Sequence, residues 1–587
     1  MRESTRNRIN YYSKIIIVIT GIIGVISVII EYGFNLPEKY SSVLHYTAIG
    51  VVVFFIFYQF VQLSLKEKKL EYLKSRKIEF LITFLILLEF FLYLFGFSVV
   101  RRIGLALKFQ NIALLYIIAL QFIIIIEFFL GGLRYNSLIL QSKIHPARLF
   151  VLSFIMTILI GALFLMLPKA TVHQNITFMD ALFTSTSAVC VTGLTVFDTA
   201  TYFTRFGQTV ILILIQIGGL GLVTFTTFFA IFLAGGLGLR ERFMLQDLLG
   251  EQNVSQIGRI IAIVIFVTLG IELIGAVLLF QSISIYAKTF EEAVYISVFH
   301  SISAFCNAGF SVFSLNLMDP MIRNNYYFNT VISLLIIVGG LGYPTIINIF
   351  SKRIFASIPE KVKNRITLQT RMVILSTILL IILGAVLTYY CDYYHSLNNL
   401  NTAEKIFHSY FQSVSARTAG YNTVDISQFS VSTTLVYLFL MFVGASPGGT
   451  GGGIKTTTLM IIILSFWSFL RNDKNVNFGK RSINNLVVLR ALLKGIFTLF
   501  IITLGVFLLT ITDANKILLD ISFEAFSAFG TVGLSRGITP LLSYAGKMVI
   551  ITLMFIGRIG PLTFMFSIIK AKDKVDFDYP SEEISTV

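Results

Sequence analysis

Charged residues are scarce in this sequence. Only 13% of its 587 residues are Asp, Glu, Lys or Arg, whereas 56% are hydrophobic and the mean hydropathy is +0.83. A soluble domain normally carries about 25% charged residues. The shortage excludes an ordinary soluble protein, and the many apolar runs of about 20 residues predict an all-α polytopic membrane protein.

Cysteine and histidine are also few. The three cysteines, Cys190, Cys306 and Cys391, form no CxxC pair, which argues against a disulfide framework and against a zinc site. The six histidines are scattered, so no cluster of His, Asp or Glu at membrane depth indicates a membrane enzyme. We therefore expect no enzymatic activity and no covalently bound cofactor.

Acidic residues are outnumbered by basic ones, and the formal net charge is +16. Basic stretches at 66–77, 352–371 and 471–494 lie between apolar runs. The positive-inside rule places these loops and the N-terminus in the cytoplasm, so the basic balance reflects topology rather than nucleic-acid binding. No cleavable signal peptide is evident, and the first apolar run reads as a membrane span.

Residues 1–145 contain four apolar runs, at about 15–31, 44–65, 79–99 and 112–131, which we interpret as accessory transmembrane helices. Arg101, Arg102 and Lys108 precede the fourth run, as basic residues do in a voltage sensor. A sensor would carry Arg or Lys at every third position, and these three do not. An interfacial helix is the preferred interpretation.

One motif recurs four times in the rest of the chain. SAVCVTGL (187–194) is followed by SAFCNAGF (303–310), SARTAGY (415–421) and SAFGTVGL (527–534). A phenylalanine stands four residues before each serine, at intervals of 116, 112 and 112 residues: Phe183, Phe299, Phe411 and Phe523. The near-constant interval indicates a repeat architecture with a small subdomain as its unit.

Each unit follows the same plan of apolar span, short helix, motif and second span. The units are predicted at 146–245, 246–360, 361–480 and 481–572, with a cytoplasmic tail at 573–587. The short helices, about 179–190, 291–305, 403–416 and 520–529, cannot cross a bilayer and must re-enter on the same side. Non-helical backbone at membrane depth must be buried or line a cavity, so a shared central pore is expected.

The second spans also share a pattern. IGGLGLVTF (217–225), VGGLGYPTI (338–346) and IGRIGPLTF (556–564) correspond, and we expect these three spans to be continuous. Repeat three instead has VGASPGGTGGGIKTTT (443–458), where one proline and six glycines predict a broken helix. The segment superficially resembles a phosphate loop, but that loop requires glycine before the lysine, and Ile454 stands there.

The motifs suit the passage of a partly dehydrated cation. Backbone carbonyls replace the water ligands of such an ion, glycine allows the unusual dihedrals, and the short helix directs its negative C-terminal end at the cavity. The segments contain no acidic residue, which argues against a divalent or non-selective filter. The predicted ion-binding filter residues are Cys190, Val191, Thr192, Gly193, Cys306, Asn307, Ala308, Gly309, Thr418, Ala419, Gly420, Gly530, Thr531, Val532 and Gly533.

These motifs resemble the Trk/Ktr/HKT superfamily of potassium transporters, over roughly residues 146–572. All four filter segments match, as do SPGGTGGGIKTTT and FIGRIGPLTF. The resemblance implies four membrane–pore-loop–membrane repeats in one chain and K⁺ bound at Gly193, Gly309, Gly420 and Gly533. Sodium-selective plant members typically have serine at the first position. The four N-terminal helices are a departure, since the family usually has two or none.

The resemblance also implies an intramembrane gating loop and assembly partners. The implied gate residues are Gly444, Ser446, Gly448, Gly449, Thr450, Gly451, Gly452, Gly453, Lys455 and Arg558. Ionisable groups at membrane depth are functional hypotheses by default, which supports Lys455 and Arg558 independently. The implied partners are a second copy of the subunit and a separate cytosolic nucleotide-binding ring of the kind found in Trk and Ktr systems.

Other polar residues near the motifs receive structural interpretations. We expect Arg417, beside the third glycine, to point sideways into the protein, onto a carboxylate. His300, His408 and Glu524 are assigned to corresponding places on the solvated surface of the short helices. Glu89 and Glu272 lie within spans and have no identifiable partner in the sequence.

The sequence as a whole predicts a multipass potassium-uptake subunit of the plasma membrane, the inner membrane in bacteria. A sodium-selective or weakly selective transporter of monovalent cations is the alternative, with Na⁺ as the second candidate ion. A purely structural membrane protein is a further class, but it has no use for four re-entrant segments. Channel and ion-coupled mechanisms are not distinguished.

Overall fold

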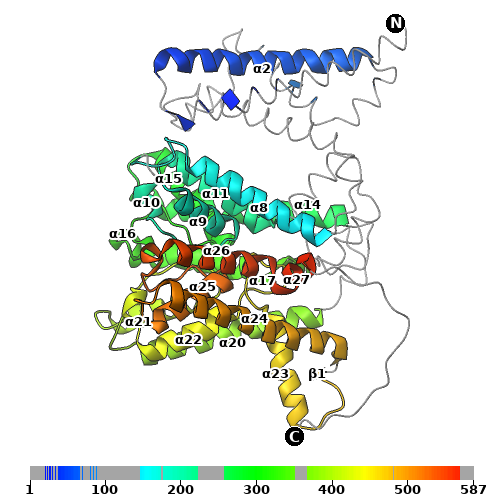
Figure 1. Cartoon of the computed structure of the whole chain (residues 1–587), viewed down its shortest axis with the longest axis vertical. Helices are drawn as coiled ribbons and strands as arrows, with labels where there is room; N and C mark the ends of the chain where they lie inside the picture. Colours follow the sequence, from blue (N-terminus) through cyan, green and yellow to red (C-terminus); the bar gives the residue numbers. More distant parts are fainter. Residues whose placement is uncertain are drawn as a thin grey trace.

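The protein is built mainly of helices joined by short loops (Figure 1). The computed structural model describes residues 37–65, 146–173, 176–221, 257–350, 366–479 and 481–568, with isolated positions between 20 and 91. A short antiparallel pair of strands, β1 (Asn477–Phe478) and β2 (Arg481–Ser482), follows the third unit. The helical class predicted from the composition is confirmed.

The N-terminal region contributes one long described helix, α2 (Glu38–Leu65), which covers the predicted run at 44–65. It lies at the edge of the molecule beyond α8 (Pro146–Leu165) (Figure 1). The predicted runs at 79–99 and 112–131 lie outside the described residues, apart from isolated positions. Glu89 and the basic residues Arg101, Arg102 and Lys108 also lie outside them.

Four similar helical units follow, each with a first helix, a short helix and a second helix. The first two contain α8, α9 (Phe178–Val189) and α11 (Arg205–Leu220), then α14 (Ile257–Ile283), α15 (Phe290–Phe305) and α17 (Tyr326–Leu341). The others contain α20 (Leu368–Cys391), α21 (Thr402–Ser415) and α22 (Val431–Phe442), then α24 (Asn485–Thr512), α25 (Leu518–Gly530) and α26 (Tyr544–Ile559). Every short helix begins and ends within two residues of its predicted bounds.

Local sequence explains where the short helices begin. The hydroxyls of Thr177 and Thr289 each accept a hydrogen bond, at 3.2 Å, from the backbone N–H three residues later. Asn401 and Glu404 form a reciprocal capping box at the start of α21. These bonds satisfy N–H groups that the helix leaves unpaired, and an acid in the first turn favours the positive end of the helix dipole.

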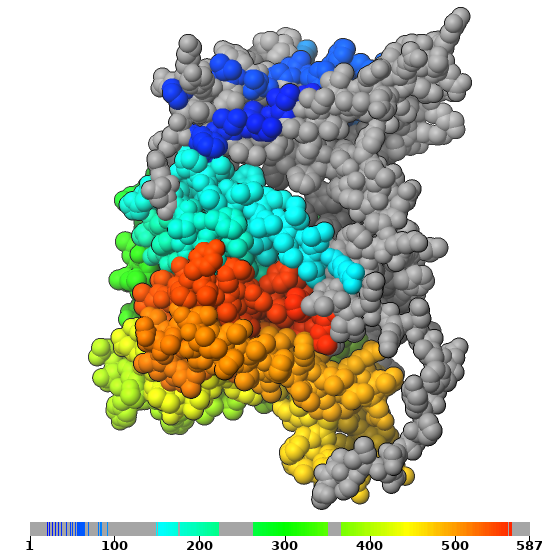
Figure 2. Space-filling model, viewed as in Figure 1, coloured from blue at the N-terminus to red at the C-terminus, as the bar shows by residue number. Residues whose placement is uncertain are grey.

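The four units close into a ring. Each second helix packs on the short helix of the next unit: α11 on α15, α17 on α21 and α22 on α25. The circle is completed by α26 of the fourth unit, which packs on α9 of the first. Figure 2 shows this closure, with the cyan residues of the first unit against the red residues of α26 and α27 (Pro561–Ile568).

Glycine permits close packing at the same place in every first helix: Gly161, Gly275, Gly384 and Gly505. A Cβ on Gly275 would lie 2.9 Å from Leu335 of the second helix, and one on Gly505 would lie 2.7 Å from Leu553. A Cβ at these positions would require the leucine to shift, so each glycine lets the first and second helices of its unit approach closely, and in the first three units it also accommodates a serine of the short helix.

The second spans are broken, which corrects the prediction that three of them are continuous. Gly221, Gly342 and Gly560 follow the ends of α11, α17 and α26 with φ of +76°, +84° and +91°. Such dihedrals cannot continue a right-handed helix. The chain bends by 100° between α17 and α18 (Tyr343–Phe350). The predicted break in the third unit is confirmed, since residues 443–455 separate α22 from α23 (Thr456–Leu470).

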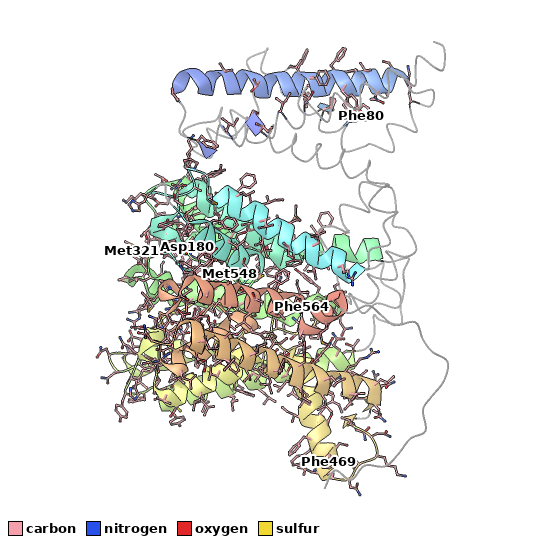
Figure 3. The ribbon with its side chains drawn as sticks, viewed as in Figure 1. Phe80, Asp180, Met321, Phe469, Met548 and Phe564 are labelled. Carbon is pink, nitrogen blue, oxygen red and sulfur yellow. The ribbon has the colours of Figure 1, made fainter. Side chains whose placement is uncertain are left out.

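Several described helices have the length and composition of membrane spans. Three qualify alone, within α14, α20 and α24, and the bent pair α17–α18 makes a fourth if it is counted as one span. Figure 3 places Asp180 and Met321 near one end of the bundle, Phe564 toward the opposite end, and Phe469 below the bundle, near the end of α23. Helices such as α8 and α26 extend between these two ends (Figure 1).

An ion pair joins the fourth unit to the first at the end of the bundle that contains Asp180. Lys547 Nζ of α26 lies 2.6 Å from Asp180 Oδ1 of α9, and the two side chains are 14% and 10% exposed. Removing one partner of a nearly buried pair leaves the other charge poorly solvated. The pair therefore helps to hold the ring closed.

We predict that Asp180→Asn lowers the free energy of unfolding by about 1–3 kcal/mol, between the values typical of exposed and fully buried pairs. The measurement is thermal unfolding of the purified protein in detergent. Lys547→Met provides the second arm of a double-mutant cycle, and the double variant should lose less than the two single variants combined. Simple additivity would show that the two charges do not interact.

Candidate functional site

The four SA…G motifs form equivalent non-helical segments at the C-terminal ends of the short helices; we call them the glycine segments. Two residues in each, separated by one residue, have positive φ, whereas the residue between them does not. The first member of each pair is Val191, Asn307, Thr418 or Thr531, with φ between +50° and +70°. The second is Gly193, Gly309, Gly420 or Gly533, with φ between +69° and +92°.

This alternation has a direct consequence for the carbonyl groups. In an ordinary strand successive carbonyls point in opposite directions, whereas alternating left- and right-handed dihedrals turn them toward the same side. The third segment is one residue shorter between its serine and its glycine, yet it keeps the same spacing of two between Thr418 and Gly420. The backbone conformation is therefore common to all four segments.

The four glycines meet in a closed ring. A Cβ built on Gly309 would lie 2.9 Å from Gly420 Cα, and one on Gly420 would lie 3.3 Å from Gly533 Cα. One on Gly533 would lie 3.0 Å from Gly193 Cα, and one on Gly193 would lie 3.2 Å from Gly309 Cα. The ring has room for backbone only, so glycine is required by its conformation and by the space around it.

The serine of each motif supports its glycine segment, a role that the sequence analysis did not assign. Gly193 N–H donates to Ser187 Oγ and Gly533 N–H donates to Ser527 Oγ, each at 3.1 Å. Ser303 Oγ donates to the carbonyl of Phe310 at 2.8 Å, and Ser415 Oγ donates to that of Tyr421. Four fully buried hydroxyls thus hold the unusual backbone in place.

The cysteines at the start of the first two glycine segments are enclosed by protein. Cys190 and Cys306 are completely buried, and Cys306 Sγ lies 3.7 Å from a carboxylate oxygen of Glu272 on α14. Gln216 donates to the other oxygen of Glu272 at 3.2 Å. Glu272 therefore has partners that the sequence could not identify.

The broken part of the third unit, residues 443–455, is held against the second unit; we call it the interrupting loop. Ser446 N–H donates to Gly340 O at 2.9 Å, and Thr450 N–H donates to Gly339 O at 3.2 Å. Thr450 Oγ1 donates to Phe305 O, the last carbonyl of α15, at 3.2 Å. These hydrogen bonds therefore fix the interrupting loop next to the end of α15, where the second glycine segment begins.

The interrupting loop also reaches the third and fourth glycine segments. Gly452 N–H donates to Thr531 Oγ1 at 2.8 Å, and a Cβ on Gly451 would clash with Thr418 Oγ1. Its base is closed by a hydrogen bond of 2.9 Å from Gly444 N–H to Ile454 O. At each glycine of this loop a Cβ would lie within 3.0 Å of a neighbouring atom, so the loop backbone is closely surrounded.

Two cationic side chains donate to carbonyls of the interrupting loop. Lys455 Nζ donates to Gly451 O at 2.8 Å. Arg558 of α26 donates through Nη1 to Thr450 O and through Nη2 to Gly218 O of α11. The arginine thereby links the third, fourth and first units, and the loop is also bonded to Gly339 and Gly340 of the second unit.

The assignment of three polar residues to a solvated surface was wrong. His300, His408 and Glu524 are completely buried, because each short helix is enclosed by its own first helix, a neighbouring second helix and the loop after its glycine segment. His300 bonds to Ser311 Oγ at 3.0 Å, His408 to Thr423 Oγ1 at 2.9 Å, and Glu524 accepts from Ser535 at 2.8 Å.

The assumed correspondence between these residues also needs correction. His300 and Glu524 each follow the motif phenylalanine, whereas His408 lies one turn before Phe411. The matching residue in the third unit is Gln412, which is completely buried. Arg417 points away from the ring, as predicted, but onto Thr377 Oγ1 at 3.4 Å rather than onto a carboxylate.

Comparison with known proteins agrees with this architecture. A family model described as "TrkH: Cation transport protein" matches residues 149–576. The chain is 39% identical to the Ktr system potassium uptake protein B of Bacillus subtilis, over 77% of this chain and 99% of the relative. It is 35% identical to the potassium/sodium uptake protein NtpJ of Enterococcus hirae, over 76% and 98%.

A solved structure has the same fold. The crystal structure of the potassium transporter TrkH from Vibrio parahaemolyticus superposes with a TM-score of 0.61 at 17% identity, covering 80% of this chain and 97% of that one. The fold and the glycine ring thus define a multipass membrane subunit of the Trk/Ktr class. The chain belongs to the TrkH family of cation transport proteins.

The burial of the two segment cysteines leads to a labelling prediction. We expect a charged, membrane-impermeant thiosulfonate to modify Cys391, which is partly exposed, but neither Cys190 nor Cys306 in the folded protein. Mass spectrometry of intact protein reports the number of modified thiols. The variant Cys391→Ser should take up no label until it is unfolded in dodecyl sulfate. Native labelling that K⁺ suppresses would place a thiol on the pore side of the ring.

Proposed function

We propose that the protein takes up K⁺ across the plasma membrane through the ring formed by the four glycine segments. The observation that carries this proposal is the repeated alternation of positive φ, which aligns backbone carbonyls around one closed ring. Rings of carbonyl oxygens replace the hydration shell of a cation. The short helices also direct their negative ends at the ring, which favours a cation there.

Potassium is the preferred ion for two reasons. Several relatives carry potassium uptake in their names, including proteins B and D of Bacillus subtilis at 39% and 36% identity. All four segments have glycine at the ring position, so no side-chain hydroxyl adds a ligand there. These points support the assignment of the ion-binding residues made from the sequence.

A less selective monovalent cation transporter is the second candidate function. It is favoured by the name of one relative, a potassium/sodium uptake protein that is 35% identical over 76% of this chain. The same ring would serve both functions, with Na⁺ as a transported or coupled ion. Ion competition during uptake separates the two candidates.

We further propose that the interrupting loop is a gate. Its backbone is buried between Phe305, Thr418 and Thr531, directly beside three glycine segments. Six of its residues are glycines, and glycine permits rearrangement at low steric cost. The Arg558 and Lys455 contacts would hold the loop in the closed position, and their positive charge would raise the barrier to a cation.

The proposed assembly is a homodimer in the plasma membrane, with its N-terminus in the cytoplasm. A cytosolic nucleotide-binding ring would dock on the basic loops between the units. The support is the resemblance to Trk and Ktr systems and the basic stretches at 352–371 and 471–494.

We predict that Gly193→Ser lowers the K⁺/Na⁺ permeability ratio by about fivefold or more. A side chain at φ of +92° costs about 1–2 kcal/mol, and its Cβ would lie 3.2 Å from Gly309 Cα. The measurement is the reversal potential, or the uptake of each ion by cells lacking other potassium systems.

Gly537→Ser is the matched control for this experiment. Gly537 has a φ of +94°, but no atom lies within 4 Å of a Cβ built on it, because it lies in the loop after the fourth segment. The backbone strain is therefore similar, while the ring is untouched. An unchanged ratio in Gly193→Ser, or an equal fall in Gly537→Ser, would falsify the assignment of the filter.

Deleting residues 449–452 is predicted to raise K⁺ flux in the absence of a regulatory partner and to leave ion preference intact. The deletion removes the Arg558 and Thr531 contacts but keeps the bond from Gly444 to Ile454 that closes the loop. Arg558→Gln weakens the contact between Arg558 and the loop without shortening the chain, and it should also raise K⁺ flux. Both are measured in proteoliposomes.

The control is the K⁺/Na⁺ ratio of each variant, which a gate does not determine. If both variants reach the membrane in normal amounts and conduct no faster than the parent chain, the loop is not the gate.

A further inference from the structure

The loop after the second glycine segment is longer than its three counterparts. From the ring glycine to the start of the second helix the intervals are 12, 17, 11 and 11 residues in chain order. Most of the extra residues form α16 (Pro320–Arg323), whereas the 3-10 helix before it, η2 (Asn316–Met318), has counterparts in η3 (Ile426–Gln428) and η4 (Thr539–Leu541). This extension is one feature by which the second unit departs from the other three.

One side chain of this loop, at the start of η2, reaches the glycine ring. Asn316 Nδ2 lies 3.4 Å from Gly309 O and 3.3 Å from Gly420 O, two carbonyls that belong to adjacent units. Asn316 Oδ1 accepts a hydrogen bond of 2.9 Å from Leu317 N–H. The amide orientation follows from these partners, since the opposite orientation would place an oxygen against two carbonyls and a nitrogen against an N–H.

The backbone is shaped to deliver this side chain. Leu315 and Asn316 have consecutive positive φ values of +63° and +60°. Asparagine tolerates this conformation, whereas it is uncommon for leucine. A left-handed leucine indicates that the surrounding structure imposes the turn on the chain.

Contacts on both sides of Asn316 fix the turn. Asp198, in the corresponding loop of the first unit, accepts from Ser314 Oγ at 3.2 Å and from Leu315 N–H at 3.4 Å. Leu317 is completely buried. Asp319 caps α16 by accepting from Met321 N–H at 3.0 Å. The loop is therefore anchored to two units and lies at the end of the bundle where Figure 3 shows Met321.

The two carbonyls that Asn316 contacts belong to Gly309 and Gly420, the second of the two positive-φ residues in each of their segments. They converge on a single nitrogen, so the same two oxygens can converge on a cation. A neutral amide donor satisfies these carbonyls, but it binds carbonyl oxygens less strongly than a charged group does. The amide and a cation cannot occupy the position together.

We propose that the Asn316 amide is an internal competitor for the outermost cation position of the ring, and that it sets the apparent affinity for external cations. The side chain must leave Gly309 and Gly420 before an ion binds there. This inference rests on the proposed function, and it adds a residue outside the four glycine segments that determines ion entry. An apparent dissociation constant rises in proportion as the binding-competent state becomes rarer.

The test compares two substitutions that remove the competitor in different ways. Asn316→Gly removes the amide and keeps the positive φ, so the turn is preserved. Asn316→Asp keeps the size of the side chain, but its carboxylate is repelled by the two carbonyls and attracts cations. Both variants should lower the KM for external K⁺ by about threefold to tenfold, while the maximal rate changes by less than about twofold.

External Ba²⁺ provides an independent measurement in the same cells. Both variants should be inhibited at lower Ba²⁺ concentrations than the parent, because the outermost position is vacant. The gain in Asn316→Asp should shrink at high ionic strength, whereas that in Asn316→Gly should not, since only the former adds a charge.

Asn422→Ala is the matched control. This asparagine lies two residues after the ring glycine of the third unit, and its Nδ2 donates to Val424 O at 3.3 Å rather than to the ring. It should leave KM and Ba²⁺ inhibition unchanged. A purely structural role for Asn316 would lower the maximal rate or the amount of protein in the membrane, without a lower KM.

The failures of the two proposals are distinguishable. If the parent chain takes up no K⁺ into deficient cells, the proposed function fails. If the parent transports K⁺ and either expressed variant keeps the parental KM and Ba²⁺ sensitivity, the competitor role is wrong. If Asn316→Gly alone fails to reach the membrane, Asn316→Asp decides the question by the same two measurements.

Discussion

One constraint governs this structure: non-helical backbone N–H and C=O groups are buried at its centre and need hydrogen-bond partners. Irregular backbone at membrane depth has no water to bond with, so it must be held by the protein itself. Four serines of the short helices supply that support by bonding to the glycine segments. Because the ring admits no Cβ, the helices around it must approach closely, and small residues in the first helices make this approach possible.

The departures from fourfold similarity are as informative as the similarity. The third unit inserts a loop between α22 and α23, the fourth replaces a glycine with Arg558, and the second places Asn316 against the ring. Each departure places polar groups against the glycine ring or against the loop beside it. A symmetric ring can hold an ion. Different control of ion passage on the two sides of the ring requires elements that occur in only one unit.

The sequence predicted the ring better than its surroundings. The short helices were located within two residues because caps such as Thr177 and Asn401 are local signals. The breaks at Gly342 and Gly560 were missed, since a glycine that bends a helix and one that packs in it look alike in sequence. His300 and Glu524 were misplaced on the surface because helical periodicity cannot reveal a helix that is enclosed on every side. Nothing in the sequence singled out Asn316, whose partners are distant along the chain.

A common principle links the two ends of the site. Carbonyls turned toward one side cannot bond with one another, so without an ion they require donors from elsewhere. At one end a neutral amide from Asn316 donates to Gly309 and Gly420, and at the loop the cationic Arg558 and Lys455 donate to Thr450 and Gly451. A neutral donor is displaced by a cation more readily than a charged donor, which also repels that cation. The neutral amide of Asn316 therefore suits a position from which an arriving ion displaces the side chain. The cationic Arg558 and Lys455 suit a barrier that a cation does not displace, so the loop must be released by another event.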